Sequence, residues 1–117
     1  MTDKLLRFLD RLSRVRGVHG SMFVAADDGL PVAQLLMDDV NGRALAAFAG
    51  SLARKVSGSA AAIGAGRVRF IQMQAGSGVL LVAIGSRDLL IAIVADSGVN
   101  IGLARLEMLR AVEAALK

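Results

Sequence analysis

Few residues of this 117-residue chain could support catalysis. His19 is the only histidine and cysteine is absent, which excludes a histidine–cysteine metal site, a disulfide and a cysteine nucleophile. Several serines occur, but none lies in a Gly-x-Ser-x-Gly turn, so a Ser/His/Asp arrangement has little support. We therefore expect no catalytic, metal-binding or cofactor-binding residue and no enzymatic activity, with His19 in a structural or merely exposed role.

A glycine-rich stretch and a pair of aspartates consist of residue types that bind ligands in other proteins, but here both occur in predicted turns. Gly64-Ala65-Gly66 leads into a predicted strand, whereas a dinucleotide-binding loop opens a helix, and no Gly-Lys-Ser or Gly-Lys-Thr occurs. Asp27 and Asp28 are adjacent acids in a tight turn, where aspartate commonly bonds to the nearby backbone. The sequence thus predicts neither nucleotide binding nor an acid–base pair.

Basic residues are concentrated near the start of the chain, whose formal net charge is +4. Lys4, Arg7, Arg11 and Arg14 fall on one flank of a predicted helix. This flank suits an acidic protein surface or anionic lipid, and it is equally typical of a solvated face whose long side chains cover the sheet margin. Nucleic acid is not expected, because Trp and Tyr are absent and aromatic residues make up 3%.

Three amphipathic helices are predicted over residues 4–15, 42–58 and from 101 onward. Asn41 and Asn100 are expected to cap the second and third helices, and Asp38 and Asp39 to supply acids near the second. The expected buried stripes are Leu5, Phe8, Leu9, Leu12 and Val15, then Leu45, Phe48, Leu52 and Val56, then Leu103, Leu106, Leu109, Val112 and Leu116.

Five strands are predicted over residues 22–26, 32–36, 68–74, 79–84 and 89–95. The turn 27–31 joins the first two as a hairpin, and Pro31, the only proline, places the second at an edge because proline lacks a backbone N–H. The last two strands are apolar without alternation and belong in the middle of the sheet. The strand 68–74 is mixed in character and would be the other, unprotected edge.

These elements predict an α/β protein of the α+β sandwich type, in the order α-β-β-α-β-β-β-α. A five-stranded antiparallel sheet would carry helices on both faces, in a single domain spanning residues 1–117. The mean hydropathy of +0.58 is high for a small monomer and favours self-association. With no cysteine and no signal-peptide core near Met1, we expect a cytoplasmic protein.

Three stretches carry a resemblance to a known family. They are Val15-Arg16-Gly17-Val18, Asp28-Gly29-Leu30-Pro31-Val32-Ala33, and Asn100-Ile101-Gly102-Leu103-Ala104-Arg105. In this order, on these elements, the chain resembles the Roadblock/LC7 family over nearly its whole length. The resemblance implies a homodimer, or a heterodimer with a related chain, in which two sheets join edge to edge and the second helices pack together.

The resemblance also implies a partner. Bacterial and archaeal members, among them the MglB group, commonly bind a small Ras-like GTPase, whereas other members are light chains or scaffold subunits. We therefore expect a non-enzymatic homodimeric regulator or adaptor that modulates the nucleotide cycle or localisation of such a GTPase. A dimerisation scaffold without effect on GTP hydrolysis is the alternative.

The second predicted helix carries small residues opposite its apolar stripe, which would let two helices approach closely. Fraying of the helix end is the other explanation for its glycines. The predicted dimer interface comprises Ala47, Gly50, Ser51 and Gly58 of this helix with Phe70 and Gln72 of the strand 68–74. The predicted contacts with the GTPase are Arg43, Arg54 and Lys55, which border the small-residue strip.

Overall fold

The computed structural model describes residues 2–37, 39–86 and 88–116, and Asp38 therefore lies outside the described residues. Over these residues the chain forms three helices and one sheet of five strands. The elements are α1 (Thr2–Ser13), β1 (Val18–Ala25), β2 (Leu30–Leu36), α2 (Gly42–Ala62), β3 (Phe70–Ala75), β4 (Gly78–Ile84), β5 (Leu89–Ala95) and α3 (Ile101–Ala115). The predicted fold class and element order are confirmed.

The strands pair antiparallel in the order β2-β1-β5-β4-β3. β4 and β5 lie inside the sheet, as their continuous apolar runs predicted, and most of their residues are buried. β2 and β3 are the two edges, which confirms the prediction made from Pro31 and from the mixed character of the third strand. β3 begins at Phe70, two residues later than predicted.

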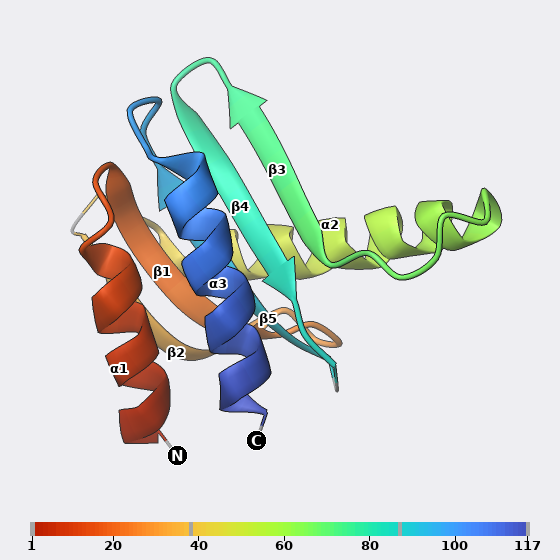
Figure 1. The fold of residues 1–117 in the computed structure, drawn as a ribbon, viewed down its shortest axis with the longest axis horizontal. Coiled ribbons are helices and arrows are strands. Elements are labelled where there is room, and N and C mark those ends of the chain that lie inside the picture. Colours follow the sequence, from red (N-terminus) through yellow and green to blue (C-terminus); the bar gives the residue numbers. More distant parts are fainter. Residues whose placement is uncertain (1, 38, 87, 117) are drawn as a thin grey trace.

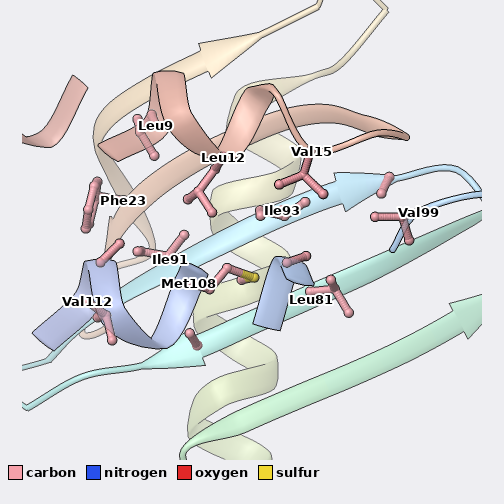
Figure 2. Packing of buried hydrophobic residues seen from close by; sticks show 14 of the residues in the cluster. Leu9, Leu12, Val15, Phe23, Leu81, Ile91, Ile93, Val99, Met108 and Val112 are labelled. Carbon is pink, nitrogen blue, oxygen red and sulfur yellow. The ribbon is translucent and has the colours of Figure 1, made fainter. Parts of the chain in front are cut away.

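Helices cover both faces of the sheet (Figure 1). α1 and α3 lie on one face, where Leu9 and Met108 meet Phe23 and Ile91 in a closely packed core (Figure 2). α2 lies on the other face, where its alanines meet side chains of β1, β4 and β5 such as Val82. Alternate residues of the central strands therefore supply two separate cores.

Several local predictions about the helices are confirmed. Leu5, Leu9 and Leu12 of α1 are buried, and Phe8 packs beside them. The side chains of Asn41 and Asn100 cap α2 and α3, since each Oδ1 accepts from a backbone N–H three residues on, at 3.1 and 3.0 Å. Asp39 lies before the cap of α2, whose first turn contains no acid.

The predicted stripes of α2 and α3 are confirmed only in part. α2 buries Leu45 together with small residues, and Phe48 is exposed while Leu52 and Val56 are half-buried. α3 buries Val112 and leaves Leu103 and Leu106 exposed. The other buried residues are Ala46, Ala49, Gly50 and Ala53 in α2, and Ala104, Met108 and Ala111 in α3. Alanine and glycine allow the helix backbones to lie close to the strands, and larger side chains turn outward.

Candidate protein-interaction surface

One flank of α2 is closed by the β1–β2 hairpin, and we call it the hairpin flank. Gly50 is buried there, and a Cβ on it would lie 3.1 Å from the Cα of Gly29. A Cβ on Gly29 would in turn lie 3.4 Å from the Cα of Ala47. Arg54 fixes the same contact, because its Nη1 donates to the carbonyl of Ala26 and, at 3.4 Å, to that of Asp27.

The other flank of α2 is open and borders a surface pocket of about 530 Å³, so we call it the pocket flank. Leu45 and Phe48 contribute the apolar wall on the helix side, and Phe48 is 48% exposed. Ala44 and the residues just before α2, Asp39, Val40 and Asn41, continue this wall, and the rest of the lining comes from segments distant in sequence, namely His19, Ser77, Gly78, Val94, Ala95 and Asp96. The exposed aromatic ring and the hollow together form a site that a protein side chain could fill.

His19 and Asp96 form part of the pocket's polar rim, with His19 Nε2 2.9 Å from Asp96 Oδ2. The bond to His19, followed by the backbone N–H of Gly98, lowers the pKa of the Asp96 carboxyl below its ordinary value. The Asp96 N–H also donates to the carbonyl of Gly17. The pair therefore ties the start of β1 to the end of β5. In the part of the chain that the structure describes, no three His, Cys, Asp or Glu residues gather as a metal site would need.

The β3 edge lies beyond the pocket. Phe70 and Ile71 are half-buried, Gln72 is exposed, and Arg105 of α3 lies 5.7 Å from the centre of the Phe70 ring. Among residues 2–37, 39–86 and 88–116, no strand pairs with the outer side of β3. The last turns of α2 extend past this edge (Figure 1), and Ile63, just after them, is 82% exposed.

The predicted interface residues are distributed over these surfaces. Ala47, Gly58 and Gln72 are exposed, and Ser51 and Phe70 are half-buried, so each is accessible to a partner. Gly50 is not, because it packs inside its own chain. The interface role of the accessible residues stays a prediction.

The three basic residues predicted to contact a GTPase are all exposed on α2. Arg43 and Arg54 are eleven residues apart, or roughly 16 Å along the helix. The Arg54 guanidinium is committed to the hairpin carbonyls, whereas Lys55 lies on the outer side of the helix. The structure therefore does not gather the three side chains at one point.

Sequence reasoning missed Phe48 as a surface residue, and with it the pocket. A signal was present, because the one large aromatic side chain of α2 occurs in a stretch rich in alanine. A helix that packs through alanines has room for an aromatic residue on its outer side. The hollow itself could not be read from sequence, since its lining comes from four separate segments.

The basic flank of α1 is also at the surface. Arg7, Arg11 and Arg14 are exposed, and Arg14 pairs with Asp10 at 3.0 Å across one helical turn. Both side chains of this pair are largely exposed, so its contribution to stability is small.

Comparison with known proteins assigns the fold to a family. Residues 4–95 match the family model described as the Roadblock/LC7 domain. The chain belongs to the Roadblock/LC7 family. An uncharacterized protein of Methanocaldococcus jannaschii, MJ1340, is 32% identical to this Roadblock/LC7 chain over 107 residues, or 92% of each chain.

Solved structures agree on the fold. MglB of Myxococcus xanthus superposes with a TM-score of 0.86 at 17% identity, covering 97% of this Roadblock/LC7 chain and 86% of that one. An MglB described as having a tetrameric arrangement gives a TM-score of 0.84 at 20% identity, covering 97% and 85%. In the described part of the chain, none of the helices has the length and apolar character needed to cross a membrane.

Proposed function

We propose that this Roadblock/LC7 chain is a non-enzymatic homodimeric regulator or adaptor, acting in the cytoplasm, that binds a small Ras-like GTPase and modulates its nucleotide cycle or localisation. The observation that carries the proposal is the open β3 edge beside an α2 helix that runs past it. Exposed edge strands invite pairing, and a β3 edge paired with its copy about a two-fold axis gives a closed interface.

Antiparallel pairing of two β3 strands would keep both α2 helices on one face of a continuous sheet. The end of each α2 would then extend over the neighbouring protomer on the side of its pocket. Ile63, at the end of the overhang, and Phe48, beside the pocket, are both apolar and exposed. Their burial in the dimer would remove apolar surface from water, which favours association. The similar MglB with a tetrameric arrangement further supports self-association.

A second copy on the pocket flank would leave the hairpin flank of α2 free for a different protein. Arg54 contacts that flank, and Arg43 lies eleven residues, or about three turns, before it on the same side of the helix. Lys55 follows Phe48 by seven residues and so lies on the side of the pocket flank. Because Arg54 already donates to two hairpin carbonyls, it is not free to enter a nucleotide site as an arginine finger does. This favours regulation by docking, in which the GTPase keeps its own catalytic residues.

The dimer is tested with the variant Phe48→Ser, measured by light scattering on a sizing column. We expect the wild-type chain to be a dimer at tens of micromolar and the variant to shift toward monomer, because it loses apolar contact area at the interface. Leu106→Ser is the matched control, since Leu106 is 46% exposed on α3 at the opposite face. A monomeric wild-type chain would contradict the proposal.

The regulatory role is tested by GTP hydrolysis and nucleotide release with the small Ras-like GTPases of the source organism, with and without this chain. We expect one of these GTPases to bind this chain and to show a changed rate of GTP hydrolysis or of nucleotide release. A dimer that binds a GTPase without changing hydrolysis or release would instead support the scaffold role.

A further inference from the structure

A groove runs between α1 and α3, which lie side by side and antiparallel on the face of the sheet opposite α2 (Figure 1). It contains a hollow of about 130 Å³. The lining residues are Phe8, Arg11 and Leu12 of α1 with Glu107, Arg110, Ala111 and Ala114 of α3. Leu12 and Ala111 are buried and Phe8 is half-buried, so the floor is apolar and could receive one apolar side chain of another molecule. We call this site the helix groove.

Helical spacing extends the helix groove along α3. Arg110 and Ala114 are four residues apart and therefore lie on the same side of the helix, toward α1. Leu103 precedes Arg110 by seven residues, so it lies on this side too, and it is 43% exposed. From Leu103 to Ala114 the groove is roughly 16 Å long, which matches about three turns of a partner helix.

The helices that form the helix groove carry most of the net positive charge of the chain. Residues 3–16 and 101–115 contain seven basic and four acidic side chains, namely Lys4, Arg7, Arg11, Arg14, Arg16, Arg105 and Arg110 against Asp3, Asp10, Glu107 and Glu113. This excess of three positive charges compares with a net charge of +4 for the whole chain. The surface around the groove is therefore complementary to an acidic partner.

The two arginines of the lining are available for such a partner. Arg14 is paired with Asp10, but Arg11 and Arg110 form no ion pair with any carboxylate of residues 2–37, 39–86 and 88–116. Glu107 is the single acid of the lining, against these two arginines. A guanidinium group can bind a carboxylate through two parallel hydrogen bonds, which fixes the position of the partner side chain.

An acidic protein fits the helix groove better than an anionic membrane does. Proteins that lie on a membrane surface commonly insert Trp or Tyr at the interface, and the sequence contains neither. The four acids among the basic residues would also be repelled by anionic lipid headgroups. An apolar floor with charged borders, between two helices, is instead the kind of site that an amphipathic helix occupies.

We propose that the helix groove binds an acidic amphipathic helix of a partner protein. The partner places one apolar side chain in the hollow and another against Leu103, and its carboxylates bind Arg11 and Arg110. The site is on the opposite face of the sheet from α2, so it is separate from the proposed contacts with the GTPase. The inference does not depend on the proposed function, and it gives the chain a different kind of partner.

The probe is a fluorescein-labelled peptide of about 18 residues made of Leu, Ala and Glu, with leucines at helical spacing and Glu on both sides of them. The control peptide has Lys in place of every Glu. Fluorescence anisotropy measures the binding of each peptide to the wild-type chain. We expect a Kd below about 100 µM for the acidic peptide and binding at least about tenfold weaker for the basic one. Added salt should weaken the acidic peptide further.

Variants of the chain locate the site. Arg11→Glu/Arg110→Glu should weaken the acidic peptide by about tenfold or more, because two attractive contacts become repulsive. Arg67→Glu/Arg69→Glu changes the net charge equally at exposed positions outside the groove, and it should leave the Kd within about twofold. Ala114→Leu fills the hollow from within and should weaken binding by about fivefold or more. Circular dichroism and urea unfolding check that all three variants are folded.

Three results would overturn the proposal: no binding of the acidic peptide, equal binding of the two peptides, or an unchanged Kd in Arg11→Glu/Arg110→Glu. Vesicles of phosphatidylcholine and phosphatidylserine test the lipid alternative by sedimentation, and we expect the chain to stay in the supernatant. Sedimentation of the wild-type chain with these vesicles, abolished in Arg11→Glu/Arg110→Glu, would make the groove a membrane contact and would also overturn the proposal.

Discussion

At the scale of single residues, the one histidine connects two distant parts of the chain through a side-chain hydrogen bond. The sequence indicated a structural or exposed role for His19, and the observed contact is with Asp96, 77 positions later in the chain. That partner could not be predicted, because only the pairing of β1 with β5 brings the two together. The contact gives Asp96 a lowered pKa, with a measurable consequence.

The free energy of unfolding should decrease in acid as Asp96 becomes protonated. Its pKa is lowered from 3.8 in the folded state, so its carboxylate stabilises the fold fully above that pH. The contribution is lost as the pH falls below 3.8 through the lower folded pKa. Urea unfolding of wild type and Asp96→Asn between pH 7 and pH 2.5 measures this, and we expect a shallower acid slope in the variant. His19→Gln should flatten the slope too, and an unchanged slope in both variants would contradict the assignment.

At the scale of elements, the sequence predicted which segments form helices and strands better than it predicted which helix face is buried. The leucines of α1 recur at helical spacing on one face, and they are buried as expected. In α2, two stripes compete, one with large side chains around Phe48 and one with alanines around Ala49. The alanine stripe is buried, because the hairpin and sheet approach the helix too closely for large side chains.

A pair of glycines in α2 tests this close approach. Gly50→Val should destabilise the protein by about 1–3 kcal/mol, because a new side chain meets the Gly29 backbone and the Arg54 guanidinium. Gly58→Val should change stability by less than about 0.5 kcal/mol, since a Cβ at Gly58 has nothing within 4 Å. Urea unfolding measures both. Equal losses at the two positions would mean that the hairpin does not restrict α2.

At the scale of the whole molecule, the sequence predicted both sheet edges correctly, because proline and side-chain patterning act locally on a strand. It did not predict the pocket, or that the large apolar side chains of the β2 edge, such as Leu30 and Val32, are exposed. Both depend on how distant segments pack and on which apolar residues remain uncovered. The candidate interaction surface therefore emerges only at this scale, whereas the basic residues near it were visible in the sequence.

The proposed dimer makes unfolding depend on concentration. Association stabilises the folded state by mass action, so the Tm of the wild-type chain should rise as its concentration increases from 1 to 100 µM, a range of about two decades. Phe48→Ser should unfold at a Tm nearly independent of concentration, whereas Leu106→Ser should keep the dependence. Differential scanning calorimetry makes the measurement, and a concentration-independent wild-type Tm would argue against a dimer in equilibrium with monomer.

Phe23 pairs with Ala33 and Val24 with Pro31, so Val32 is an extra residue in a bulge of β2. This bulge and Pro31 would limit the size of the proposed assembly. A sheet whose two edges both accepted a copy of themselves would add protomers at each end and grow into a filament. In the proposed dimer one edge pairs with its copy and the other is blocked, so growth would stop after a single addition. Pro31 and the extra residue Val32 would thus prevent the proposed dimer from polymerising through its outer edges.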